Sequence, residues 1–434
     1  MSHPAIVHPE MPSERSTHYR FVVAAVLFVT LLIAYLDRVN VSVLVADPHF
    51  LQDMDMVGDA VRIGLLNTAF LLTYGIANIV LGRVGERIGA KTAMLIAVAI
   101  WVAAMVLGGA ATGFAMMIMA RILLGIGEGL HWPMQSIIVT HWFPERERAK
   151  ANAAWLLGLM VGPMIAAPLF VSIIGHWGWR SSFLFLSILN FLPIILIAIL
   201  VTTRPEQSRF VGSVERAYIR QGQDESEDRR DSLLREDSVD SEEAATRFWA
   251  DYRFWFLTVA YMSSQSIFFG LVAWLPKYLQ DVRGFSFNDL GFLASLPYVF
   301  GVLFLIIFGY AADRVSRRAP FVVVALTLAS VFILSASNAS DNRLSAYLLA
   351  LGVGSLGIGL SSYWAILQRM VHRSLVGAAA GVMNGAGMIF TALVPTIIGF
   401  TIRWSGAYTG GLFFLVGLGL LGALLMAVLS LKKV

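Results

Sequence analysis

The sequence predicts an all-α membrane protein in which twelve transmembrane helices form two six-helix bundles. Three observations lead to this fold class: the composition, the number of long apolar segments, and a short motif that occurs twice. Of the 434 residues, 57% are hydrophobic and only 14% are charged. A chain with so little polar surface needs lipid as the solvent for much of its exterior.

Long apolar segments alternate with short polar ones along most of the chain. A bilayer core of roughly 30 Å needs about 20 apolar residues per helix, so twelve spans use about 240 residues. In the first half we predict spans near residues 21–43, 63–82, 93–112, 115–138, 151–173 and 181–201. In the second half we predict spans near residues 254–276, 290–311, 320–337, 345–367, 375–399 and 408–430.

The distribution of basic residues predicts that both termini face the cytoplasm. Most of the 32 Lys and Arg residues fall in segments on one side of the membrane, as the positive-inside rule requires of cytoplasmic loops. The first loop on the opposite side carries the acidic residues Asp47, Asp53, Asp55 and Asp59. The polar N-terminal tail lacks a signal-peptide core, so we expect the first span to remain as an anchor.

Four segments follow from this topology. They are a cytoplasmic N-terminal tail (1–20), an N-terminal six-helix bundle (21–201), a cytoplasmic linker (202–252) and a C-terminal six-helix bundle (253–434). The linker is rich in charged residues, Ser and Gln. This composition favours a solvated tether with one amphipathic helix over a regulatory or partner-binding segment, which is the alternative.

The repeated motif lies after the second span of each half and supports the two-bundle arrangement. Both copies read Gly-x-x-x-acid-Arg; they comprise Gly82, Glu86 and Arg87, and Gly309, Asp313 and Arg314. The glycine permits close helix approach, and the acid and arginine can form cytoplasmic ion pairs that break when the halves rock. We therefore predict that these residues form a gate.

These two loops resemble the signature loop of the major facilitator superfamily. In the first loop Gly89 and Lys91 also match, and Glu86 replaces the usual aspartate while keeping its charge. The resemblance covers essentially the whole chain and implies the major facilitator fold. It does not specify a substrate.

Four ionisable residues lie well inside predicted spans, and all are in the first half: Asp37, Arg38, Arg121 and Glu128. A charge at membrane depth costs about 2.5 to 3.5 kcal/mol even on lenient insertion scales, so these residues need partners or a water-filled cavity. A structural ion-pair network is one interpretation. A functional site is the other, and intramembrane charges favour it by default.

Helical spacing predicts that these groups face one cavity. The fourth span has one polar face, formed by Arg121, Gly125, Glu128, Trp132 and Gln135. Tyr35, Arg38 and Ser42 share a face of the first span, with Asp37 about 100° away from Arg38.

Such a cavity would couple protons to an anion. Arginines suit a carboxylate, but the two acids compete for them until protonated. At an effective dielectric of about 20 and a separation of about 4 Å, each such interaction is worth about 4 kcal/mol. By linkage, proton and anion then strengthen each other's binding, which is the physical basis of symport.

Three segments together resemble the anion:cation symporter family, which includes permeases for hexuronates, galactonate, glucarate, tartrate and phthalate and is related to sialin and the vesicular glutamate transporters. They are Asp37-Arg38-Val39-Asn40, the glycine-rich run Arg121 to Gly129, and the loop Trp142 to Arg148. The resemblance implies that Arg38 and Arg121 hold the substrate carboxylate and that Asp37 and Glu128 are protonated. It further implies a pocket lined by Tyr35 and Tyr74.

In the second half, the resemblance implies substrate contacts from Ser361, Trp364 and Asn384. Without it, Asn384 within a series of glycines is typical of close helix packing, so both interpretations remain open. Sugar-acid members carry a polar residue midway along the fifth span, where this chain has Leu157, Leu159 and Met160. A less hydroxylated acid is therefore an alternative substrate, because an unpaired buried hydroxyl costs about 1 to 3 kcal/mol.

His131, close to Glu128, is either a packing residue or part of a proton path. The chain has no cysteine and its eight histidines show no ligand spacing, so we expect no cofactor, no metal site and no enzymatic chemistry. Basic residues in short clusters do not indicate nucleic-acid binding. The expected partners are a small organic anion, protons and membrane lipid, and we expect a monomer in a bacterial inner membrane.

Two alternatives to proton-coupled uptake follow from the same residues. The first is a major facilitator exporter or facilitator without proton coupling, because gating loops are shared across the superfamily. The second is a membrane sensor, although the linker is short and polar for a folded soluble domain.

Overall fold

The computed structural model describes residues 17–223, 250–315, 317–371 and 375–432. Within these ranges the chain is helical, without strands, and twelve helical segments are long and apolar enough to cross a membrane. The predicted fold class and number of spans are confirmed.

In the first half, the spans are α1 (Tyr19–Leu44), α3 (Ala60–Ile88), α4 (Ala90–Gly109), α5 (Phe114–Trp142), α6 with α7 (Glu145–Leu156 and Gly158–Trp177), and α8 with α9 (Trp179–Leu189 and Phe191–Leu200). In the second half, they are α12 (Tyr252–Asp281), α13 with α14 (Phe287–Leu293 and Leu296–Asp313), α15 (Ala319–Asn338), α16 with α17 (Asn342–Ser355 and Leu360–Met370, joined by η2, Leu356–Ile358), α18 (Val376–Ser405) and α19 (Thr409–Leu431). The short helices α2 (Pro48–Asp53) and η1 (Pro205–Gln207) lie outside the spans.

Several helices extend beyond the predicted spans into charged sequence. α3 continues to Ile88 and α6 already begins at Glu145. Hydropathy marks only the apolar part of a helix, whereas backbone hydrogen bonding can continue into water wherever the residues favour a helix. The acidic residues of the first loop serve as helix caps, since Asp47 and Asp59 accept hydrogen bonds from the backbone amides of His49 and Arg62.

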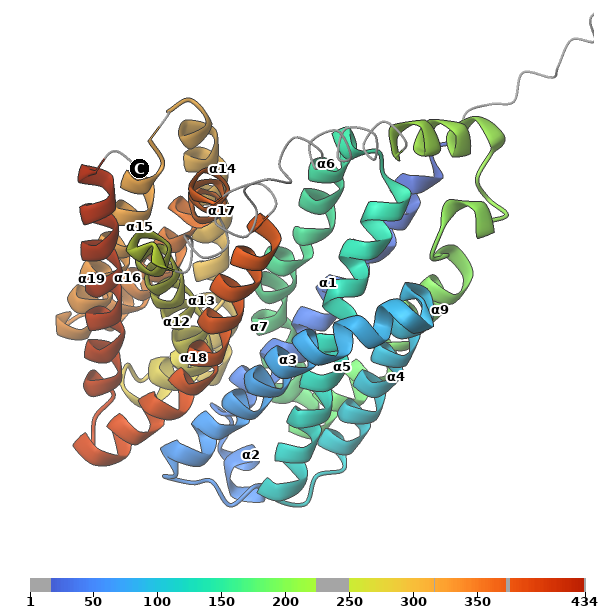
Figure 1. The fold of residues 1–434 in the computed structure, drawn as a ribbon. Coiled ribbons are helices and arrows are strands. Elements are labelled where there is room, and N and C mark those ends of the chain that lie inside the picture. The colour runs from blue at the N-terminus through green and yellow to red at the C-terminus, as the bar shows by residue number, and fades with distance from the viewer. Residues whose placement is uncertain (1–16, 224–249, 316, 372–374, 433–434) are drawn as a thin grey trace, which may run out of the picture.

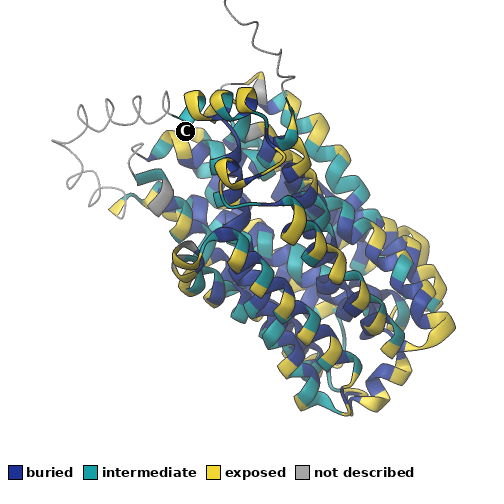
Figure 2. Cartoon of the chain, turned by 90° about the vertical axis from the view of Figure 1, so that its right-hand side faces the viewer, coloured by how far each residue is buried: buried dark blue, intermediate teal, exposed yellow. Residues whose placement is uncertain are grey.

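The exterior has the burial pattern of a lipid-facing protein. Exposed residues follow the outward faces of the helices, while buried residues fill the interior of each half (Figure 2). Many exposed side chains are large and apolar, including Ile79, Ile306 and Leu424. In water this surface would be unfavourable, so it is consistent with solvation by acyl chains.

The two halves lie side by side and meet closely at the end that carries α2, here called the α2 end (Figure 1). There the start of α3 packs against the end of α18, and glycines bring the two backbones close together. A Cβ atom on Gly64 would lie 2.4 Å from the carbonyl oxygen of Pro395, and one on Gly399 would lie 2.4 Å from that of Ala60. The hydroxyls of Thr68 and Thr396 are 2.8 Å apart across the same contact.

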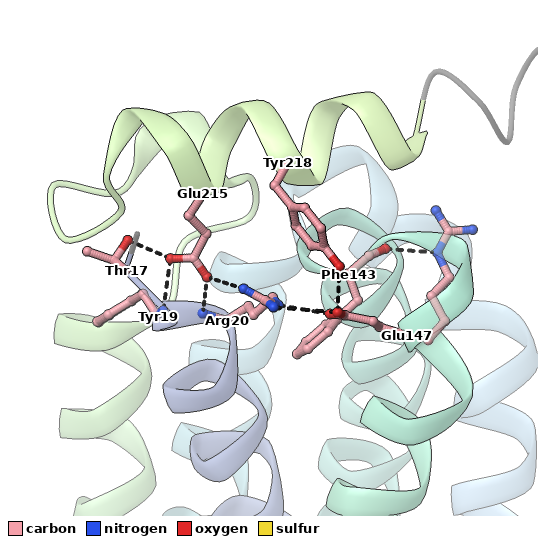
Figure 3. A network of polar contacts seen from close by, with 8 residues as sticks. Thr17, Tyr19, Arg20, Phe143, Glu147, Glu215 and Tyr218 are labelled. Carbon is pink, nitrogen blue, oxygen red and sulfur yellow. Dashed lines mark hydrogen bonds and ion pairs between the residues drawn. The ribbon is translucent and has the colours of Figure 1, made fainter. Parts of the chain in front are cut away.

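The opposite end carries the start of α1 and the first part of the linker, and is here called the linker end (Figure 1). Residues 213–223 form a helix whose Glu215 accepts hydrogen bonds from the Thr17 hydroxyl, the Tyr19 amide, and both the amide and the guanidinium of Arg20, at 2.6–3.1 Å (Figure 3). Arg20 also pairs with Glu147 at 2.9 Å, and Glu147 accepts a hydrogen bond from the Tyr218 hydroxyl at 2.7 Å.

This part of the linker is therefore packed on the first half, whereas a solvated tether was expected. Burial alone would raise the pKa of the Glu215 carboxyl, but its hydrogen bonds outweigh burial and hold that pKa below its usual value. Residues 224–249 of the linker lie outside the described residues.

Candidate functional site

An ion pair between α1 and α5 lies at the centre of the first half. The Nε atom of Arg38 donates to Oε2 of Glu128 at 3.2 Å, and Nη2 of Arg38 contacts the same oxygen. Both side chains are buried. Spacing predicted that these two residues face one cavity; in the structure they pair with each other, and only Arg38 lines the cavity described below.

Close packing of α5 on α3 helps to place Glu128. A Cβ on Gly125 would lie 2.5 Å from the carbonyl oxygen of Phe70, and one on Gly129 would lie 2.6 Å from that of Tyr74. Only glycine permits this approach of the two backbones. As a result the polar face of α5 lies against the aromatic residues of α3.

Aromatic rings surround the Arg38 guanidinium. Its Cζ atom lies 4.4 Å from the ring centroid of Tyr35 and 5.0 Å from those of Phe70 and Tyr74. Nη1 also donates to the Tyr35 hydroxyl at 3.1 Å. Ring faces stabilise a cation in a site with little water, so this cage holds the charge in place.

Arg121 also contacts the ring of Phe70. Its Cζ atom is 4.6 Å from the Phe70 ring, and its Nε atom donates to the carbonyl oxygen of Leu66 at 3.2 Å. Its two terminal nitrogens, Nη1 and Nη2, are buried without a hydrogen-bond partner. A buried unpaired donor is costly, which marks this guanidinium as a group ready for an anion.

Asp37 points away from this pair. Its carboxylate accepts hydrogen bonds from the Nδ2 atom of Asn190 at 3.0 Å to each oxygen. Asn190 lies at the break between α8 and α9, and the side chains of both residues are almost completely buried. The structure thus brings together Arg38, Glu128, Tyr35 and Tyr74, and holds Asp37 in a separate contact.

A cavity lies between α1, α3 and α7 of the first half and α12 and α14 of the second. Arg38 is the one charged residue among those that line it, and Tyr35 lines it as well. Ser42, Asn67 and Tyr298 are its other polar lining residues. Arg121, Asp37, Glu128 and Tyr74 do not line the cavity, whereas Phe70, which contacts Arg121, does.

The predicted second-half residues lie outside the lining of this cavity. Asn384 accepts a hydrogen bond from the Tyr261 hydroxyl at 3.0 Å, and the Trp364 ring lies 5.6 Å from that of Tyr261. Ser361 lies on the same helix, α17, and is half-buried. These contacts agree with a packing role for Asn384, and ligand contact stays a prediction.

The predicted gate is only partly visible. The side chains of Glu86 and Asp313 lie outside the described residues. Arg314 contacts the Tyr310 hydroxyl, with its Cζ atom 4.0 Å from the Tyr310 ring. The remaining members, Gly82 and Arg87 on α3 and Gly309 on α14, lie at the linker end, and the gating role stays a prediction.

His131 packs inside the first half. Its ring lies 4.9 Å from that of Trp101, and its Nε2 atom is buried without a hydrogen-bond partner. Among the described residues, no group of three or more His, Asp or Glu side chains is placed to hold a metal ion.

Sequence reasoning missed several residues of the site. Asn190 is the one strongly polar side chain in a long apolar stretch, and this isolation could have drawn attention to it. Phe70, Phe268 and Phe269 carry no such signal, because phenylalanine is common in membrane helices.

Comparison with known proteins agrees with this architecture. The model of the Major Facilitator Superfamily matches residues 27–395. The chain is 26% identical to the hexuronate transporter of Bacillus subtilis, over 92% of each chain. It is 27% identical to the D-galactonate transporter of Escherichia coli, over 93% of this chain and 94% of that protein.

Two solved structures share the fold. A bacterial homolog of the human lysosomal transporter Spinster, in an inward-facing and occupied conformation, matches with a TM-score of 0.75 and 17% identity over 96% of this chain and 97% of that one. The D-xylose-proton symporter matches with a TM-score of 0.73 and 15% identity over 94% and 97%. This chain belongs to the major facilitator superfamily and is a multi-pass transporter of the cell membrane.

Proposed function

We propose that this protein takes up a small organic anion together with protons by alternating access. The pairing of Arg38 with Glu128 at the wall of the cavity carries the proposal. A guanidinium suits a carboxylate because it can donate two parallel hydrogen bonds to it. Transporters for hexuronate and galactonate, both carboxylates, are among the similar proteins.

Glu128 competes directly with an incoming anion for Arg38. Its carboxylate already occupies the Nε and Nη2 donors that a substrate would use. Protonation of Glu128 weakens that pairing, and at an effective dielectric of about 20 and about 4 Å the lost attraction is worth about 4 kcal/mol. Because the coupling is reciprocal, a bound anion makes Glu128 easier to protonate.

Asp37 serves as a second protonation site in this proposal. It does not reach the cavity, so it acts on Arg121 and Glu128 through their electrostatic interaction across the bundle. Neutralising Asp37 makes the surroundings of Arg121 more positive and therefore more attractive to an anion.

Arg121 becomes available when Phe70 moves. The ring of Phe70 contacts both guanidinium groups, with each Cζ atom within 5.0 Å of the ring centroid. Rotation of this ring would let the unpaired Nη1 and Nη2 atoms of Arg121 share the substrate carboxylate with Arg38.

The access side follows from the close contacts at the α2 end. The α3–α18 contact brings the halves together there, so we propose that the substrate exchanges at the linker end in this state. Basic residues that follow the spans at the linker end support a cytoplasmic assignment for it. We propose a monomer in a bacterial inner membrane.

The test is uptake by proteoliposomes with and without an inward proton gradient. Asp37→Asn and Glu128→Gln should each abolish accumulation driven by the gradient, while exchange of internal for external substrate continues. Arg38→Lys should weaken substrate binding at least about tenfold, because it loses the forked donor. Glu206→Gln, a change at an exposed residue of the linker, is the matched control.

Gradient-driven accumulation by both acid variants would contradict the coupling model. Equal uptake by the wild-type protein with and without the gradient would instead favour a facilitator, and net efflux would favour an exporter.

A further inference from the structure

The two walls of the cavity differ in chemistry. The first-half wall provides the charged and most of the polar groups, namely Tyr35, Arg38, Ser42 and Asn67. The second-half wall formed by α12 is apolar and consists of Phe268, Phe269, Val272 and Ala273. A ligand held by Arg38 therefore has its charged end on α1 and the rest of its body against α12.

Aromatic rings dominate the space that this body would occupy. Phe268 and Phe269 are half-buried, with ring centroids 5.2 Å apart and planes at 89°. Phe268 also lies 6.0 Å from the ring of Tyr298, with planes at 82°. Phe70 faces them from α3 across the cavity. Such edge-to-face arrangements leave ring faces and edges available for another flat ring.

The polar groups are too few for a polyhydroxylated ligand. Tyr35 already accepts a hydrogen bond from Arg38, and only Tyr298 offers a polar atom from the second half. A sugar acid carries several hydroxyls besides its carboxylate, and each one left unpaired in a buried site would weaken binding by about tenfold.

We propose that the transported anion is a monocarboxylate with an aromatic or otherwise flat apolar body. This inference rests on the proposed function, because it assigns the substrate class to the same cavity. The carboxylate pairs with Arg38, and the ring lies between Phe70 of α3 and the phenylalanines of α12. Leu157, Leu159 and Met160 of the fifth span do not line the cavity, to which this span contributes Pro163.

The experiment compares two classes of acid on the full-length protein. Benzoate and phenylacetate represent the aromatic class, and galactonate and glucuronate represent the hydroxylated class. Uptake is measured in proteoliposomes by competition, with thermal stabilisation of the purified protein as the binding measurement. The aromatic acids should compete at concentrations at least about tenfold lower than the sugar acids.

A pair of variants tests the aromatic wall directly. Phe268→Leu keeps an apolar side chain but removes the ring, so the apparent affinity for benzoate should fall about fivefold to tenfold. The apparent affinity for propionate, a carboxylate without a ring, should change less than twofold. The matched control is Phe413→Leu, at a residue that is 51% exposed on the lipid side of α19. It should change neither the apparent affinity for benzoate nor that for propionate.

The outcomes separate this inference from the proposed function. Preferred transport of galactonate or glucuronate that is lost in Arg38→Lys would overturn the inference and leave the function standing. Failure of both classes to bind or to be transported would overturn the function and the inference together. An equal loss of benzoate and propionate affinity in Phe268→Leu would also count against the aromatic wall.

Discussion

Asn190 holds Asp37 in a contact that depends on the charge of the carboxylate. A single amide nitrogen donates to both carboxylate oxygens, and the Oδ1 atom of Asn190 is buried without a partner. These bonds stabilise the charged form, whereas the low dielectric of the bundle opposes it. In the proposed mechanism, Asn190 is thus a positioning residue for Asp37.

We expect Asn190→Leu to move the pH at which uptake is half-maximal upward, because the bare carboxylate retains its proton more firmly. Asn190→Gln keeps the amide and should restore most of the wild-type profile. The measurement is initial uptake against external pH, together with the apparent substrate affinity. A lower rate with an unchanged pH profile would show that Asn190 is only structural.

Helical periodicity predicted which side chains share one face of a helix. It could not predict which residues of other helices contact them. Periodicity placed Arg121 and Glu128 on one face of α5 and separated Asp37 from Arg38 by about 100°. It contained no information that Phe70 of α3 would contact both arginines or that Asp37 would meet Asn190. Both facts depend on tertiary packing across helices far apart in the sequence.

At the scale of elements, the helix at residues 213–223 joins the start of α1 to α6. Glu215 receives four hydrogen bonds from the segment Thr17 to Arg20, and Arg20 connects it to Glu147 of α6 (Figure 3). Composition favoured a solvated tether because charged residues usually prefer water. Here complementary charges meet at short range, and a count of residue types does not reveal such pairing.

Docking of this helix should depend on pH. The folded pKa of Glu215 is lowered, so its contribution to stability is complete above the unfolded pKa and is lost as the pH falls through the folded one. We expect Glu215→Gln to lower the stability of the docked helix by about 2 kcal/mol at pH 7, the scale of hydrogen bonds to a charged group. It should also flatten the decrease in melting temperature below about pH 5, the range that runs from the usual Glu pKa down through the lowered folded pKa.

Limited proteolysis of the linker and thermal melting across pH would measure this effect. Glu206→Gln, at an exposed position of η1, should change neither the rate of linker proteolysis nor the dependence of melting on pH. Identical pH profiles for the wild-type protein and Glu215→Gln would refute the assignment.

At the scale of the whole molecule, the sequence predicted twelve spans in two halves because hydropathy and charge act along the chain. It could not predict where the halves meet. The α3–α18 contact depends on Gly64 and Gly399, which have no distinctive sequence context among the 38 glycines. Likewise the breaks in the fifth, sixth, eighth and tenth spans follow from packing as well as from local sequence.

We expect Gly64→Val to shift the protein away from the state described here. Even a Cβ atom would overlap the Pro395 carbonyl, so the α2 end would open and exchange from the linker end would slow. The chain has no cysteine, so paired labels can be introduced without background. Distances between labels at Ser172 and Asn288, both at the α2 end, should lengthen in the variant. Gly75→Val, where a Cβ meets open space, is the control.

In the alternating-access mechanism proposed above, the hydroxyl contact between Thr68 and Thr396 would separate and re-form in every cycle. Each extra interaction there would prolong the dwell time of the carrier in the described state and delay the return of the empty site. Affinity measured from the linker side would then rise while the maximal velocity fell. The small number of side-chain interactions in this contact therefore balances affinity for scarce substrate against the maximal velocity of transport.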